Sequence, residues 1–336
     1  MFMQYPTVFD CTEMTAAVNK LPARPFFFQP LFEVKGVKTT TVSLDIRKGR
    51  IVLIGDSPRN TAPESLAGRG AKRESMNLSC AHLAMSDTLA PEDLQDVRAF
   101  GSTEPISVAE VYNDKMQQLK DNMTATMEFH RLGAIKGVVL DADGTTVLHD
   151  IFKTFGVTKK TLPILFPKTA ADDANPIQTS ILNAKRHVEA AMGGTPFSHI
   201  ECIIGSDAYD MLTSHVLVRK YFEDWLARKQ DYGNNDYRKR GFTYGGLTFV
   251  ERSDVVGGQT MVAAKKGHVY PVGPGIFKQY HAPADWMETV NTIGLEYYAR
   301  MDKKEKSRGI DIEVQTNPLT LCTYPEALVE LDFKAA

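Results

Sequence analysis

Apolar residues recur with helical spacing between residues 106 and 133. Positions i, i+4, i+8, i+11, i+15 and i+19 are apolar, which places them on one face of an α-helix. These positions are Val108, Tyr112, Met116, Leu119, Met123 and Met127. Ser107 and Glu110 have the spacing of an N-terminal capping box, and Gly133 is a suitable helix terminator. We predict one long helix whose methionine-rich face packs into a core.

Two further stretches have the pattern of β-hairpins. Residues 40–46 alternate between apolar and polar and are followed, after a short connection with Gly49, by the apolar run 51–54. A second pair of apolar runs flanks the turn residues 141–144. Strands joined by such short, glycine-containing connections predict hairpins.

The remaining pattern mixes helices and strands without regular alternation or an internal repeat. Helices are expected near 10–19, 177–192 and 207–229, and a buried strand is expected at 199–204. Residues 242–270 have the pattern of strands separated by glycine-rich turns. The predicted fold class is therefore α+β.

Two polar segments interrupt this pattern. Residues 55–77 are rich in Gly, Ser, Pro, Arg and Glu, and residues 230–241 are polar and charged. A structureless stretch longer than about 12–15 residues is unusual inside a compact domain. We therefore interpret the first quarter of the chain as extended arms that lie on another molecule, such as a second copy of the chain. Residues 230–241 are interpreted as an exposed loop.

Composition limits the classes of protein to which this chain can belong. Of its 336 residues, 43% are hydrophobic and 24% are charged, which is typical of a globular protein and excludes wholesale disorder. The 39 basic and 41 acidic residues give a net charge of −2, which argues against a protein that coats nucleic acid. No run approaches the ~20 apolar residues of a membrane span, and the N-terminus lacks the pattern of a secretory signal. We expect a soluble protein made inside the cell, without membrane contact.

The cysteines and histidines do not have the spacing of a metal site. Cys11, Cys80, Cys202 and Cys322 are far apart in the sequence, and the eight histidines contain no i, i+4 metal-binding pair. A disulfide scaffold is also uncommon in a chain of this size. The sequence therefore predicts no metal and no cofactor.

One motif points to an enzyme. Residues 141–145 read DADGT after an apolar run, which matches the signature of haloacid-dehalogenase-type phosphotransferases. In such an enzyme Asp141 would be the nucleophile, Asp143 the general acid and base, and Mg²⁺ would neutralise the phosphate charge. Asp207 and Asp210 resemble the acidic metal-binding motif of that superfamily. The alternative function is thus a Mg²⁺-dependent phosphatase that uses this motif.

Three features favour a turn over catalysis at 141–145. Asp tolerates the left-handed backbone conformation and Gly adopts a positive φ, so the DADG sequence suits a tight hairpin turn. A predicted strand follows the turn at once, whereas a phosphotransferase would lead from this loop towards a helix. More than 130 residues that resemble extended arms precede the motif. We therefore predict no catalytic residues.

Short segments in a fixed order resemble a known family over nearly the whole chain. The segments are 19–22 with 31–32, 40–45, 87–101, 131–137, the turn 141–144, 155–156, 309–313 and 317–319. Each segment is short, and their ordered set carries the resemblance. The family that they resemble is the lambda-type phage major capsid protein E family.

The resemblance implies the tailed-phage, Hong Kong 97-like capsid fold. The implied parts are an N-terminal arm (1–38), an extended hairpin called the E-loop (39–80), a peripheral domain (81–175 with 291–336) and an axial domain (176–290). A spine helix of the peripheral domain is implied at about 107–132. The DADG turn looks like the tip of a peripheral-domain hairpin, and 230–241 looks like the tip of the axial domain.

The implied function is that of a major capsid protein, a structural protein of the virion and not an enzyme. Its copies are expected to self-assemble, as pentamers and hexamers, into the icosahedral head shell that encloses double-stranded DNA without sequence-specific binding. The further partners to expect are a portal protein, a scaffolding protein and a decoration protein. Assembly is expected in the cytoplasm of the host bacterium.

Overall fold

The computed structural model describes residues 11–22, 27–47, 73–95, 107–167, 175–228 and 237–335. The chain divides into two compact units. Unit 1 comprises Met1–Val42, Asn77–Arg131 and Lys278–Thr320, and unit 2 comprises Ser43–Met76, Leu132–Phe277 and Leu321–Ala336. Both units mix helices with strands, so the α+β prediction is confirmed.

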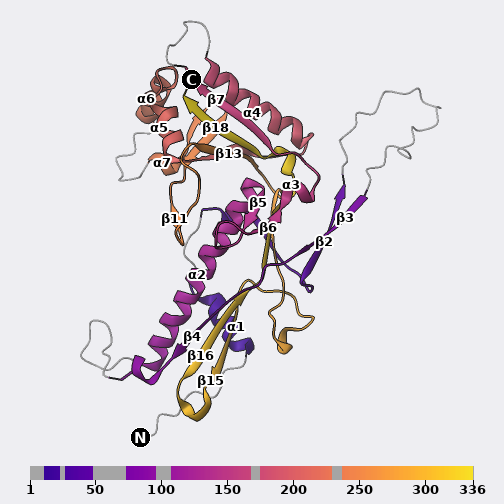
Figure 1. Ribbon diagram of the computed structural model, residues 1–336, viewed down its shortest axis with the longest axis vertical. Coiled ribbons are helices and arrows are strands. Elements are labelled where there is room, and N and C mark those ends of the chain that lie inside the picture. Colours follow the sequence, from indigo (N-terminus) through magenta and orange to yellow (C-terminus); the bar gives the residue numbers. More distant parts are fainter. Residues whose placement is uncertain are drawn as a thin grey trace, which may run out of the picture. The chain divides into compact units, whose positions relative to one another are not determined.

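Unit 1 is built on two helices and a three-stranded sheet (Figure 1). The helices are α1 (Cys11–Lys20) and α2 (Val108–Lys136), and the sheet has the order β15 (Tyr298–Lys303), β16 (Ile310–Thr316), β4 (Leu83–Leu89). Neighbouring strands of this sheet are antiparallel. The predicted apolar stripe of α2 packs with α1 and with the inner face of this sheet, and Met116 and Met127 are fully buried.

The α2 helix begins as predicted and ends later than predicted. The Ser107 hydroxyl accepts from the Glu110 N–H (3.2 Å), and the Glu110 carboxylate accepts from the Ser107 N–H (3.0 Å), which is a complete capping box. Gly133 does not end the helix. The end comes at Gly137, whose φ of +83° suits glycine.

Gly133 is instead required for close packing. A Cβ atom at this position would lie 2.8 Å from the Cα of Val139. The glycine therefore lets the last turns of α2 approach the strand that follows, β5 (Val138–Leu140).

A second, smaller sheet belongs mainly to unit 1. Its order is β1 (Phe32–Gly36), β14 (Phe277–His281), β17 (Pro318–Cys322), and every residue of β17 is buried. The β1 strand lies at an edge of this sheet and exposes Glu33, Val34 and Lys35.

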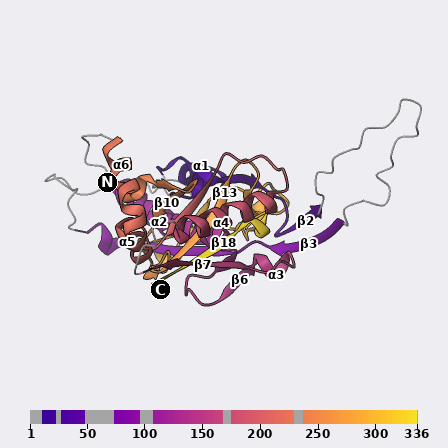
Figure 2. The ribbon, with the colours of Figure 1, turned by 90° about the horizontal axis from the view of Figure 1, so that it is seen from above.

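Unit 2 is organised by a six-stranded mixed sheet. Its order is β7 (Lys160–Phe166), β18 (Val329–Ala335), β13 (Lys266–Val272), β8 (His199–Ile204), β10 (Leu247–Glu251), β9 (Phe242–Tyr244). The β7–β18 and β8–β10 pairs are parallel, and the others are antiparallel. Residues 199–204 form the predicted buried strand. The α4 helix (Pro176–Met192), predicted at 177–192, packs against β7 (Figure 2).

The helix predicted over 207–229 is two helices, α5 (Ser206–Ser214) and α6 (Val216–Arg228). His215 separates them with an extended backbone (φ −66°, ψ 136°). Its ring explains the break, because Nδ1 accepts from the Leu217 N–H (3.3 Å) and Nε2 donates to the Pro167 carbonyl (3.0 Å). The first contact caps α6 in the way that an N-cap side chain does.

The remaining elements are short. Two hairpins, β5 with β6 (Val147–Asp150) and β11 (Val255–Val256) with β12 (Gln259–Thr260), belong to unit 2, as do α3 (Ile151–Thr154) and α7 (Tyr237–Arg240). Single 3₁₀ turns lie at Gln29–Leu31, Pro91–Asp93, Met287–Thr289, Glu305–Ser307 and Pro325–Ala327. The antiparallel pair of β5 and β6 confirms the hairpin predicted around the turn 141–144.

The first predicted hairpin is described only in part. Strand β2 (Thr41–Arg47) forms as predicted, and its partner in the described residues is β3 (Arg73–Ser79). The expected partner at 51–54 lies outside the described residues, as do most of 55–77 and of 230–241. Among the helices that the structure describes, none has the length and apolar character needed to cross a membrane.

Candidate functional site

The DADG motif forms the tight turn between β5 and β6. The Gly144 N–H donates to the Asp141 carbonyl (2.9 Å), and the Asp141 N–H donates to the Thr146 carbonyl (2.8 Å). Gly144 has a φ of +70°, the backbone conformation for which glycine is suited.

The Asp143 carboxylate is fully used inside this turn. One oxygen accepts from the N–H groups of Thr145 (2.9 Å) and Thr146 (2.8 Å), and the other accepts from the hydroxyls of the same residues (2.9 and 2.7 Å). These bonds, led by the Thr146 hydroxyl, hold the pKa of Asp143 well below its ordinary value. A carboxylate so strongly held in the ionised form is a poor general acid.

The other aspartates of the alternative function do not complete a metal site. Asp207 lies in the first turn of α5, next to the Ser206 hydroxyl, and Asp210 lies one turn later. In the described part of the chain, which includes Asp141, Asp143, Asp207 and Asp210, no three His, Cys, Asp or Glu side chains gather to hold a metal ion. The described residues thus do not gather these four aspartates into one set of metal ligands.

A buried charged network, which the sequence analysis missed, lies in unit 1 around Arg131. This side chain has 0% exposure. Its Nε donates to Gln279 Oε1 (2.8 Å), Nη1 lies 3.3 Å from a Glu128 carboxylate oxygen, and Nη2 lies 3.8 Å from Glu296. The second Glu128 oxygen accepts from the Phe28 N–H (2.7 Å). One guanidinium thus connects α2 with β14, with the segment before β15 and with the N-terminal part of the unit.

His281 extends this network. Gln279 Nε2 donates to His281 Nε2 (2.7 Å), which requires the neutral tautomer with its proton on Nδ1. Burial, followed by the positive charge of Arg131, lowers the pKa of His281 to about 4. The ring is therefore neutral at neutral pH.

A signal for the Arg131 network was present in the sequence. The apolar stripe of α2 reaches Met127 and then meets Glu128 and Arg131, which are three residues apart on the same face. Charged residues that continue a buried stripe indicate a paired, buried charge. The partners Phe28 and Gln279 are too distant in the sequence for any local pattern to identify.

Unit 2 has a second charged set across β13 and β18. His268 pairs with Glu330 in the strand register, and Glu330 binds both Lys159 and Lys266 (2.9 Å for the latter). Burial lowers the pKa of His268 to about 3, and it lowers the pKa of Lys136, which donates to the Met261 carbonyl, to about 8. These contacts lie within the packed sheet and its edges, and we interpret them as structural.

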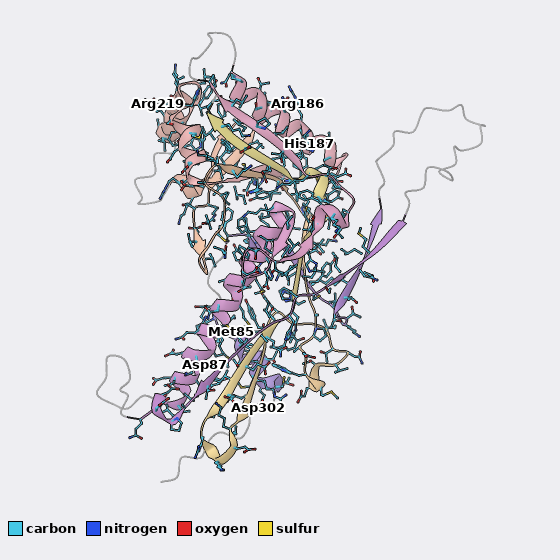
Figure 3. All side chains as sticks on the ribbon, viewed as in Figure 1. Met85, Asp87, Arg186, His187, Arg219 and Asp302 are labelled. Atoms are coloured by element: carbon cyan, nitrogen blue, oxygen red, sulfur yellow. The ribbon has the colours of Figure 1, made fainter. Side chains whose placement is uncertain are left out.

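Surface charges pair within each unit. Lys115 binds the carboxylates of Asp87 (2.9 Å) and Asp93 (3.3 Å), and Asp87 and its neighbour Met85 are labelled on β4 in Figure 3. Lys304 lies 3.2 Å from the carboxylate of Asp311. Each of these lysines is thus paired with a carboxylate.

A cavity of about 650 Å³ in unit 1 lies where β2 begins and after β3 ends. Its lining comes from residues 38–41, 80–82, 282–285, 290–291 and 317. The Cys80 N–H donates to the Thr40 carbonyl (2.8 Å), and His82 and Asn317 share a hydrogen bond (2.9 Å). Burial raises the pKa of the Cys80 thiol to about 11, so this thiol is not activated as a nucleophile.

Comparison with known proteins gives a match over nearly the whole chain. The family model described as phage major capsid protein E matches residues 10–333. The major capsid protein of Salmonella phage Felix O1 is 25% identical, with 96% of each chain covered, and that of Pseudomonas phage KPP10 is also 25% identical, with 96% of each chain covered.

Solved structures share the fold. A capsid chain of the cyanophage P-SCSP1u aligns with a TM-score of 0.52 at 12% identity, covering 94% of this chain and 90% of that one. A mature capsid chain of bacteriophage PhiM1 aligns with a TM-score of 0.50 at 13% identity, covering 94% and 89%.

Proposed function

The chain belongs to the phage major capsid protein E family, and we propose that its copies form the icosahedral head shell of a tailed phage around double-stranded DNA. The Hong Kong 97-like fold expected from the sequence is confirmed by the shared fold of capsid chains. Proteins of this family are structural. The observation that carries the proposal is the extent of the family match, from residue 10 to residue 333, which covers the whole fold rather than one module.

The paired strands β2 and β3 support an assembly role for residues 39–80. A two-stranded sheet is at best marginally stable in water, so such a pair gains stability when it lies on another surface. We assign residues 39–80 to an E-loop and 1–38 to an arm, both lying on neighbouring copies. Many modest contacts of this kind, repeated around a closed shell, add up to a stable assembly.

The further parts of the assignment follow the family. We assign 81–175 with 291–336 to a peripheral domain, with α2 as its spine, and 176–290 to an axial domain that meets its copies in pentamers and hexamers. We propose a portal protein and a scaffolding protein as further partners, with a decoration protein as an additional candidate. Assembly takes place in the host cytoplasm in this scheme.

Electron microscopy and sedimentation velocity of the purified chain test the proposal. We expect closed shells, pentamers or hexamers from the natural chain. A variant in which a short Gly-Ser linker replaces residues 48–72 should fold, as judged by circular dichroism, and should form no closed shells. A natural chain that stays monomeric even with the scaffolding protein of its phage would contradict the assignment.

A phosphatase assay tests the alternative. We expect no Mg²⁺-dependent release of phosphate from p-nitrophenyl phosphate, and no difference between the natural chain and Asp141→Asn. Turnover that disappears in Asp141→Asn while assembly is unaffected would favour the enzyme.

A further inference from the structure

The segment between β14 and β15 exposes an unusual number of large apolar side chains. We call residues 285–296 the apolar loop; Figure 1 draws it in gold beside β15 and β16. Met287 is 88% exposed, Ile293 60%, Val290 58% and Leu295 47%. These are four of the twelve exposed large apolar side chains in the described part of the chain. Such a concentration in one short segment marks an interaction surface.

The apolar loop is held firmly from within. The Thr289 hydroxyl bonds to the carbonyls of Ala284 (2.7 Å) and Trp286 (3.0 Å), and the Leu295 N–H donates to the Tyr298 hydroxyl (2.9 Å). Trp286 is buried and packs edge-to-face against Tyr298. The backbone of the loop is therefore held in place, and a partner that covers its exposed side chains would spend little free energy on ordering the loop.

Strand β1 extends this surface. The Gly294 N–H donates to the Val37 carbonyl (2.8 Å), and a Cβ at Gly36 would lie 2.7 Å from Cγ2 of Ile293. Val34, 47% exposed, is two residues from Gly36 and so lies on the same face of the strand. Val34 and Ile293 are thus parts of one apolar patch.

The surroundings of the patch limit what can cover it. Val290 and Asn291 also line the 650 Å³ cavity, so the apolar loop lies directly beside this cavity. The exposed charges nearby are of both signs: Lys38, Asp285 and Glu288. A mixed rim of this kind does not favour a polyanion or an anionic membrane, whereas it suits a protein surface that carries both signs itself.

We propose that the patch formed by the apolar loop and Val34 is a contact surface for a second copy of this chain. This inference rests on the proposed function, because a shell subunit must present apolar surface to its copies. The apolar loop supplies the apolar centre of the contact, and the charged residues around it determine how the two copies align.

Oxidative footprinting tests the proposal on the natural protein. Hydroxyl radicals oxidise exposed methionines, and mass spectrometry gives the rate at Met287, corrected with a dosimeter peptide. We expect the rate at Met287 to be at least fivefold lower in assembled shells than in free subunits. An unchanged rate in shells would overturn the proposal.

A matched pair of variants gives the second test. Ile293→Asp and Val255→Asp each place a carboxylate at a position of similar exposure, 60% and 62%, the second on the β11–β12 hairpin. We expect Ile293→Asp to raise the concentration needed for half-maximal assembly at least tenfold and Val255→Asp to change it less than twofold, both with natural thermal unfolding. Equal effects of the two variants, or none from Ile293→Asp, would overturn the proposal. A natural chain that forms no shell or capsomer contradicts the proposed function, and this inference falls with it.

Discussion

Arg131 holds a full positive charge where no water reaches it, and its contacts explain why this is tolerated. Glu128 neutralises the charge, and Gln279 satisfies the Nε donor. A buried ion pair adds little net stability, but the loss of one partner leaves the other charge uncompensated. The network therefore fixes where α2, β14 and the segment at Phe28 meet within unit 1 more than it raises stability.

Arg131→Met should destabilise the protein strongly. We expect a loss of about 3–5 kcal/mol in the free energy of unfolding, because Glu128 would remain buried and charged. Urea denaturation checks this, and the double variant Glu128→Gln with Arg131→Met should recover part of the loss. A change of less than about 1 kcal/mol in the single variant would show that Glu128 finds another partner.

His281 makes stability depend on pH in a defined window. The unfolded chain takes up a proton on this ring below about pH 6.5, while the folded chain resists protonation until about pH 4. Stability should therefore fall as the pH is lowered from about 6.5 to about 4, by roughly 3 kcal/mol from this group. The variant His281→Gln should flatten this part of the stability–pH profile, whereas an identical slope would mean that the ring does not contribute.

At the scale of elements, we expect the substitution Gly133→Ala to destabilise the protein, although Gly→Ala in a helix usually stabilises. Gly→Ala within a helix ordinarily stabilises by about 1 kcal/mol. At Gly133 the new Cβ would meet the backbone of β5 at 2.8 Å, so we expect a loss of about 1–3 kcal/mol. Thermal unfolding measures it, and Asn122→Ala, at an exposed position of the same helix, is the control that should be neutral or slightly stabilising.

Asp143 should control the local opening of the β5–β6 hairpin. Without its carboxylate the N–H groups of Thr145 and Thr146 lose their acceptor. We expect both amides to exchange with deuterium faster in Asp143→Ala, while amides of β8 stay unchanged. Because the pKa of Asp143 is lowered, the natural turn should keep its protection at moderately acidic pH. Unchanged exchange in the variant would mean that Gly144, and not the Asp143 carboxylate, holds the turn closed.

Most element types could be predicted because they depend on local patterns. The Met stripe, the capping box and the DADG turn each depend on residues of one continuous segment. The break at His215 could not be predicted, since the ring is oriented by Pro167, far away in the sequence. The helix end at Gly137 was also missed. Gly133 resembles a helix terminator in the sequence, but it is a glycine because β5 packs closely against it.

At the scale of the molecule, the β2–β3 pair should respond to assembly. In the described part of the chain β2 and β3 form a two-stranded sheet. The amide hydrogens of so small a sheet exchange quickly, and contact with a neighbouring copy would slow this exchange. We expect the amides of Thr41–Arg47 and Arg73–Ser79 to be protected in shells and not in free subunits. The amides of β8, in the centre of the six-stranded sheet, should be protected in both. Rapid exchange of β2 in intact shells would contradict the assigned role of the E-loop.

The division into two units could not be read from the sequence. Unit 2 takes its strand β18 from the end of the chain and places it between β7 and β13. The predicted arm, loop and domain boundaries are defined by the shell rather than by contacts within one chain, so that division stays a prediction. The whole-chain resemblance succeeded because it used the order of segments rather than their contacts.

Pro163 in the edge strand β7 has a consequence for the fidelity of assembly. Proline has no N–H to offer, and it is tolerated in a strand chiefly at such edges. In a growing shell, copies of the chain would be crowded enough for open sheet edges to pair wrongly. Because Pro163 interrupts the edge of β7, such wrong pairing between copies is slowed. Growth of the shell then proceeds through weaker contacts, which can dissociate and form again in the correct arrangement.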